Sequence, residues 1–142
     1  MKVRKAFAVT ALAAALSGGV AAAPAIAQES SVSPAAQSVS YIPLWSGTHT
    51  PTRYWATPDF VQHHSRWLAT NFGCWGHDGA RIKAEIVRTR DHHVMNRSAY
   101  QWCHDGHQYR LDATVSRGTA YYMRLYLKGP KHSMYAKAYE VR

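Results

Sequence analysis

Residues 108–127, QYRLDATVSRGTAYYMRLYL, decide the fold class of this chain. From Gln108 to Val115 apolar and polar side chains alternate, which is typical of a strand with one buried face. Ser116-Arg117-Gly118 follows as a short hairpin loop with glycine at the left-handed position. Across this loop Leu111 would lie opposite Met123, and the two apolar faces would coincide. We therefore predict an antiparallel hairpin formed by residues 108–115 and 119–127.

The rest of the second half of the chain also has strand patterns. His104-Asp105-Gly106-His107 is a turn signal and predicts a second hairpin that leads into residue 108. Residues 82–87 and 134–141 predict two more strands, and Tyr41 to Trp55 suits short strands or an extended segment. Together these features predict a mainly β fold, a small antiparallel β-sandwich or a partly open barrel.

One short helix is expected within residues 57–72. Thr57 would cap it, Pro58 suits its first turn, and Gly73 is a natural stop. Residues 60, 64, 67 and 68 would then share one face at helical spacing. A strand through residues 66–72 is the alternative interpretation.

Residues 1–27 have the pattern of a cleaved secretory signal. A basic start with Lys2, Arg4 and Lys5 precedes an apolar run over residues 6–16, and Ala25-Ile26-Ala27 predicts cleavage before Gln28. Ala21-Ala22-Ala23 and Ala23-Pro24-Ala25 are alternative sites. Residues 28–40 are rich in Ser, Ala and Gln and predict a disordered leader. We therefore expect a secreted protein with a single β domain over residues 41–142.

The chain is basic, with a formal net charge of +9 from 17 Lys and Arg against 8 Asp and Glu. Without residues 1–27 it would keep 14 basic residues and a net charge of +6. Such a surplus favours extracellular polyanions, among them nucleic acid, wall polymers, acidic polysaccharides and anionic lipid head groups. The mature chain has no second long apolar run, so it is not expected to span a membrane.

Cys74 and Cys103 are the only two cysteines. In an exported chain such a pair predicts a disulfide, which would close a loop of about 30 residues and contribute roughly 3 to 4 kcal/mol. The alternative is a zinc site made by both cysteines with His77 and His107. A histidine-only metal site at His77, His104 and His107 would be compatible with the disulfide. The disulfide without a bound metal is the prediction.

Signatures of catalysis are missing from the sequence. It contains no G-x-S-x-G nucleophile motif, no Gly-rich phosphate loop and no H-E-x-x-H helix. The carboxylates that could do acid–base chemistry are Glu85, Asp112 and Glu140, and no recognisable spacing ties them together. No catalytic residue and no cofactor is therefore predicted.

A basic and aromatic sheet face is the candidate binding site. In the predicted hairpin Arg110 would lie opposite Arg124, and Tyr122 and Tyr126 would share their face. Lys137 would join them from a final strand beside residues 119–127. Such a face can stack rings and hold anionic groups. We therefore expect a secreted protein that binds a polyanion, a glycan or a protein. The alternatives are a nuclease-like hydrolase that uses His and Arg, and an antimicrobial protein or inhibitor with residues 88–97 as its loop.

Overall fold

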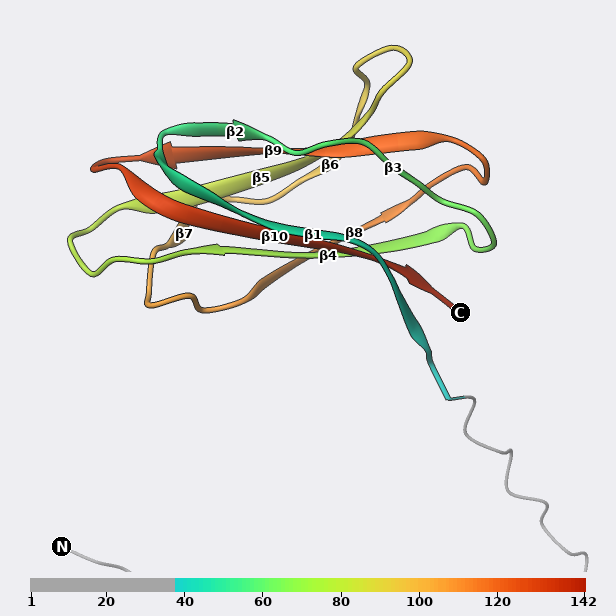
Figure 1. Ribbon diagram of the computed structural model, residues 1–142, viewed down its shortest axis with the longest axis horizontal. Helices are drawn as coiled ribbons and strands as arrows, with labels where there is room; N and C mark the ends of the chain where they lie inside the picture. The colour runs from blue at the N-terminus through green and yellow to red at the C-terminus, as the bar shows by residue number, and fades with distance from the viewer. Residues whose placement is uncertain (1–37) are drawn as a thin grey trace, which may run out of the picture. The chain divides into compact units, whose positions relative to one another are not determined.

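Residues 38–142, the part of the chain that the computed structural model describes, form a β-sandwich without a helix (Figure 1). Its strands are β1 (Tyr41–Thr52), β2 (Tyr54–Ala56), β3 (Phe60–Val61), β4 (Trp67–Cys74), β5 (Arg81–Arg88), β6 (Val94–Arg97), β7 (Gln101–Trp102), β8 (Tyr109–Thr114), β9 (Ala120–Lys128) and β10 (His132–Val141). The prediction of a mainly β fold is confirmed. The predicted signal, and the predicted leader up to residue 37, lie outside the described residues.

Two antiparallel sheets stack face to face (Figure 1). Sheet A has the strand order β1-β10-β4-β8. Sheet B has the order β2-β9-β5-β6, and in addition β3 pairs with β9 and β7 pairs with β5. The chain passes from sheet A to sheet B between β1 and β2, at Arg53.

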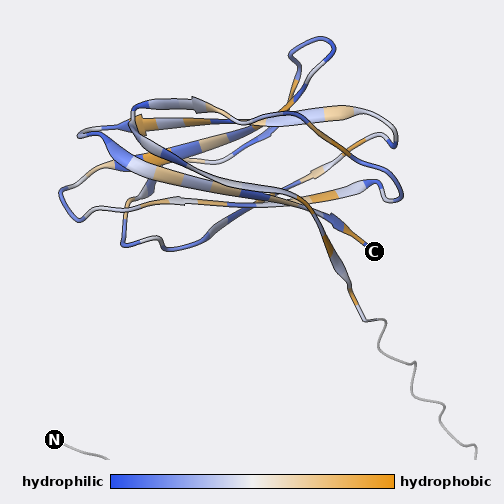
Figure 2. Cartoon of the chain, in the orientation of Figure 1, coloured by the Kyte–Doolittle hydropathy of each residue, from blue (hydrophilic) through white to orange (hydrophobic). Residues whose placement is uncertain are grey.

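The core lies between the sheets and is filled by alternate residues of each strand. Ile82, Ala84 and Ile86 of β5 have no exposed surface and form the core face of this strand, which confirms the strand predicted over residues 82–87. Phe72 of β4 and Met134 of β10 are also buried and fill the core from sheet A. Figure 2 shows the resulting alternation of hydrophobic and hydrophilic positions along the strands, and a hydrophilic loop between β5 and β6.

The predicted hairpin of residues 108–115 and 119–127 is wrong in its pairing, although both segments are strands. β8 pairs with β4 in sheet A, whereas β9 pairs with β5 in sheet B. The apolar faces of β8 and β9 therefore meet across the core instead of lying side by side. The connecting loop forms hydrogen bonds with the segment between β3 and β4. Val115 N donates to Arg66 O at 2.9 Å, and Gly118 N donates to Gln62 O at 2.7 Å. We call this connection the arch.

The predicted second hairpin is wrong for the same reason. β7 pairs with β5 in sheet B, while β8 lies in sheet A, so residues 103–108 also cross between the sheets. The predicted disulfide is confirmed at this crossing. Cys74 ends β4, Cys103 follows β7, and their sulfurs are 2.06 Å apart. Both cysteines are buried, so the bond joins the two sheets within the core.

The predicted helix over residues 57–72 is wrong. Residues 60–61 form β3, and residues 67–74 form β4 in the interior of sheet A. Thr57 does not cap a helix, because its hydroxyl accepts a hydrogen bond from Met123 N at 3.0 Å. Pairing on both sides of β4 outweighs the local helical spacing. Within residues 38–142 there is no helix long and apolar enough to cross a membrane.

Candidate functional site

The outer surface of sheet B carries three of the five residues predicted to bind a ligand. Along β9 the odd-numbered positions from 121 to 127 are buried in the core. The intervening Tyr122, Arg124 and Tyr126 therefore project outward and are half-buried. They lie on one line along the middle of the sheet.

The strand register adds further cations and rings to this line. Tyr126 lies between Tyr54 of β2 and Lys83 of β5, and Arg124 lies beside Glu85, which in turn pairs with Arg97 of β6. We call this surface the basic face. Its members are Tyr54, Arg81, Lys83, Glu85, Arg97, Trp102, Tyr122, Arg124, Tyr126 and Lys128.

Glu85 is the one carboxylate of the basic face, which carries five Lys and Arg side chains. Glu85 is 6% exposed, and its oxygens lie 2.8 Å from Lys83 Nζ and 3.0 Å from Arg124 Nη2. Burial by itself would raise the pKa of Glu85. The hydrogen bond from Lys83 and the charges of Lys83, Arg124 and Arg97 outweigh burial, so the pKa lies below its ordinary value. Glu85 is therefore ionised at neutral pH, and the face retains a surplus of positive charge.

Aromatic rings of the basic face pack against its cations. The guanidinium of Arg81 lies 4.4 Å from the centre of the Trp102 ring, and Lys83 Nζ lies 5.3 Å from that of Tyr126. Tyr54 packs on Tyr126 with ring centres 5.3 Å apart. Burial and the negative charge of Glu85 raise the pKa of Tyr126. Trp102 and Tyr54 remain 55% and 49% exposed, which leaves ring surface free to stack on a ligand.

The other two predicted residues, Arg110 and Lys137, lie on sheet A and not beside Arg124. β10 pairs with β1 and β4, so Lys137 faces outward between Ser46 and Asn71. Arg110 of β8 donates to Asp112 at 2.8 Å and to Tyr41 Oη at 2.9 Å. The predicted pair of Arg110 and Arg124 does not form, because the arch places their strands in different sheets. The five residues are thus divided between two outer faces.

The carboxylates of the two Asp-Gly turns, Asp78 and Asp105, each pair with a histidine. His77 Nε2 lies 2.5 Å from Asp105 Oδ2, and His132 Nε2 lies 2.9 Å from Asp78 Oδ1. His104 packs edge-on against His77. The disulfide occupies both sulfurs, so the alternative of a zinc site with cysteine ligands is wrong. Among the described residues no group of three or more His, Cys, Asp or Glu side chains is arranged to hold a metal ion.

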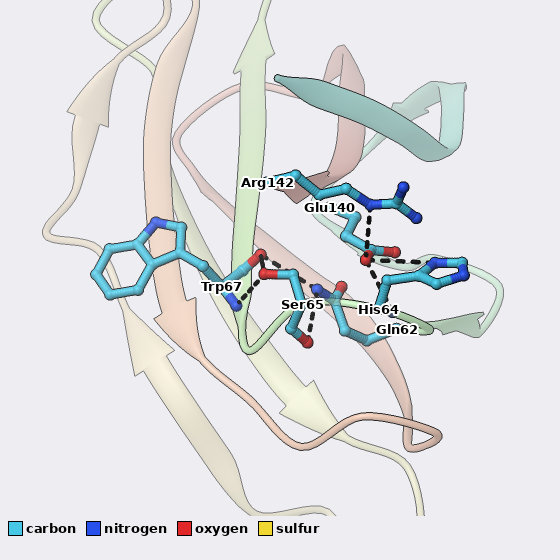
Figure 3. A network of polar contacts seen from close by, with 6 residues as sticks. All are labelled: Gln62, His64, Ser65, Trp67, Glu140 and Arg142. Atoms are coloured by element: carbon cyan, nitrogen blue, oxygen red, sulfur yellow. Dashed lines mark hydrogen bonds and ion pairs between the residues drawn. The ribbon is translucent and has the colours of Figure 1, made fainter. Parts of the chain in front are cut away.

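A network of polar contacts surrounds the buried side chains of Gln62 and Glu140 where β10 ends (Figure 3). Glu140 is 1% exposed and accepts a hydrogen bond from His64 N at 2.8 Å, with Arg142 Nε 3.6 Å away. Gln62 Nε2 donates to the carbonyl oxygens of Ser65 and Trp67 at 3.3 and 3.2 Å. These contacts fasten residues 62–67 to the last strand.

Glu140 is the group in this network that titrates in acid. Burial would raise its pKa, but hydrogen bonds from the backbone of residues 63–65 and the nearby His64 lower it below its ordinary value. Its partners are chiefly backbone N–H groups, which suits a structural carboxylate. The three carboxylates considered for catalysis do not meet, since Glu85 belongs to the basic face, Asp112 binds Arg110, and Glu140 lies here.

No protein-family model matches the chain, and no curated protein is significantly similar to it.

Sequence reasoning missed the members of the basic face outside β9. The alternation of Arg81, Lys83 and Glu85 with the buried residues of β5 does place them on its outer face. What it does not reveal is that β5 lies next to β9.

Proposed function

We propose that this chain is an exported binding protein whose basic face holds an extracellular polyanion. The observation that carries the proposal is the arrangement of five cations around a single, already neutralised carboxylate on one sheet surface. A repeating anionic ligand gains a counterion-release contribution from every cation that it contacts. Export is an expectation from residues 1–27, which lie outside the described part of the chain.

The rings of the basic face favour a linear polymer over a small anion. Tyr122, Arg124 and Tyr126 follow one another along β9 at alternate positions, which spaces neighbouring side chains by about 7 Å. The exposed Trp102 and Tyr54 extend this row toward the edges of the sheet. Flat rings pack on sugar or base units, while the cations hold the charged groups.

Binding to oligogalacturonate and to a single-stranded oligodeoxythymidylate tests the proposal. Affinity is measured as a function of salt for the wild type and for Arg81→Ala/Lys128→Ala. Loss of two cations should lower affinity about tenfold at low salt and flatten the salt dependence. Arg66→Ala/Arg117→Ala is the matched control, because it removes the same charge from exposed loop positions away from the basic face.

An equal loss of affinity in the two double variants would show that binding depends only on net charge, and it would overturn the assignment of the basic face as the binding site. Absence of binding to both polyanions would overturn the function.

A further inference from the structure

The outer face of sheet A carries two neighbouring hollows that the proposed function does not use. The first has a volume of about 340 Å³ and is lined chiefly by Trp75, Tyr135, Thr48, Gln108 and Lys137. The second has a volume of about 300 Å³ and is lined by Tyr41, Ala69, Asn71, Arg110 and Tyr139. Lys137 of the first and Asn71 of the second are direct partners in the sheet, so the hollows adjoin.

Packing fixes the aromatic wall of the first hollow. Trp75 meets Tyr135 edge-on, with ring centres 5.4 Å apart. Gly73 leaves room for this arrangement, because a Cβ there would come within 2.6 Å of the Tyr135 ring. The Tyr135 hydroxyl lies 3.1 Å from the carbonyl oxygens of Gly106 and His107, and burial raises its pKa to about 12. The wall is therefore uncharged and rigid, while Trp75 remains 40% exposed.

Hydrogen-bonding side chains surround this wall. Ser46 and Thr48 of β1 supply exposed hydroxyl groups, and Gln108 supplies an exposed amide. Lys137 stands at the side that adjoins the second hollow. An aromatic surface with a few polar groups of both donor and acceptor type is the usual composition of a small-molecule site.

The second hollow repeats this composition along β10. Tyr41 meets Tyr139 edge-on at 6.4 Å between ring centres, and the Arg110 guanidinium lies 5.1 Å from the centre of the Tyr41 ring. Ala69 lies opposite Tyr139, so no large side chain fills the space between them. Tyr135 and Tyr139 are four positions apart, about 13 Å along the strand. The two hollows together form a groove longer than one sugar ring.

Charge distinguishes this groove from the basic face. Its cations are Arg110 and Lys137, and Arg110 is already paired with Asp112. A polyanion would therefore prefer the basic face. An extended peptide would also gain little here, because peptides add to a sheet through main-chain hydrogen bonds at its edge.

We infer that the groove on sheet A binds a short uncharged oligosaccharide, with one sugar ring packed on Trp75 and another near Tyr139. The C–H face of a sugar packs on an aromatic ring, and its hydroxyl groups match the side chains around the groove. This inference is independent of the polyanion proposal, because it uses the opposite outer face.

Titration with the hexasaccharides of β-linked glucose, β-linked N-acetylglucosamine, β-linked xylose and α-linked glucose tests the inference. Tryptophan fluorescence and calorimetry report binding. At least one hexasaccharide should bind, and Trp75→Ala should weaken that binding at least tenfold. Trp102→Ala, which removes an exposed tryptophan from the other sheet, should change it less than twofold.

Thr48→Trp provides a second variant that removes no packing. It fills the first hollow from an exposed strand position and should abolish binding while the melting temperature stays within a few degrees of the wild type. The inference is overturned if none of the hexasaccharides binds at millimolar concentration. It is also overturned if Trp102→Ala weakens binding as much as Trp75→Ala, or if Thr48→Trp binds normally. Polyanion binding should be unchanged in Trp75→Ala and Thr48→Trp, because neither residue belongs to the basic face.

Discussion

Arg124 of β9 lies directly opposite Glu85 of β5, with its Nη2 atom 3.0 Å from the Glu85 carboxylate. Lys83 holds the other carboxylate oxygen at 2.8 Å. This triad sits in the middle of the basic face and is shielded from solvent at Glu85. The Glu85 carboxylate offsets one positive charge of the basic face, and the remaining positive charge is available to a ligand.

Glu85→Gln should raise affinity for oligogalacturonate about two- to fivefold, because it removes the negative charge at the centre of the face. The same change should lower the free energy of unfolding by about 1 to 2 kcal/mol, since Lys83 and Arg124 lose an ionic partner. Chemical denaturation and fluorescence titration measure the two effects. Asp112→Asn on sheet A is the matched control, and it should leave polyanion affinity unchanged.

Replacing Cys74 and Cys103 with alanine together should lower the free energy of unfolding by about 3 to 4 kcal/mol. The disulfide links β4 of sheet A to the segment after β7 of sheet B, so it keeps these two segments close together in the unfolded chain and lowers its conformational entropy. Urea denaturation of the double variant, beside the wild type with and without reductant, measures the loss. A wild type whose stability is the same in both conditions would contradict this account.

Glu140→Gln should lower the free energy of unfolding by about 2 to 4 kcal/mol at neutral pH, because a buried carboxylate loses its ionic acceptor role. The pKa of Glu140 is depressed in the folded protein, so its stabilisation is complete above the ordinary value of 4.5 and is lost as the pH falls through the lower folded value. The melting temperature should therefore depend less on pH, between neutral pH and strong acid, for Glu140→Gln than for the wild type.

His64→Ala serves as the control for this prediction. The Glu140 carboxylate takes its hydrogen bond from the His64 backbone, and the imidazole is 65% exposed. The substitution should therefore cost little stability. A loss of stability as large as that of Glu140→Gln would show instead that the imidazole, and not the backbone, is the stabilising partner of Glu140.

Gly118→Ala should lower the free energy of unfolding by about 1 kcal/mol, because Gly118 has a φ of 68° in the arch and an alanine is strained there. Space is not the cause, since no heavy atom lies within 4 Å of a Cβ at this position. Gly118→Asn should cost less, because asparagine tolerates left-handed backbone better. Thermal unfolding of the two variants separates strain from crowding.

Side-chain alternation predicts which residues of a strand are buried, and here it places the core face of β5, β8 and β9 correctly. It does not predict the partner of each strand. Two strands with matching apolar faces can lie side by side as a hairpin, or face each other across a core, and the alternation is the same. In the folded protein the arch loop donates hydrogen bonds to the carbonyl oxygens of Gln62 and Arg66, contacts that the local alternation does not predict. Both residues are more than 40 positions away in the sequence.

The same limit explains the candidate site. Tyr122, Arg124 and Tyr126 share one strand, so their common face follows from period two alone. Arg110 and Lys137 join that face only through predicted strand pairings that do not form. The segment 57–72 shows the converse case, because its helical spacing at residues 60, 64, 67 and 68 does not mark a common buried face: Phe60 and Leu68 are buried, whereas His64 and Trp67 are exposed.

Amide chemical-shift mapping with oligogalacturonate tests the central claim most directly. The account predicts shift changes that cluster on β9 around Tyr122, Arg124 and Tyr126, extend to β5 and β2, and weaken with salt. Changes confined to sheet A, or no changes at concentrations where the polyanion is in large excess, would contradict it.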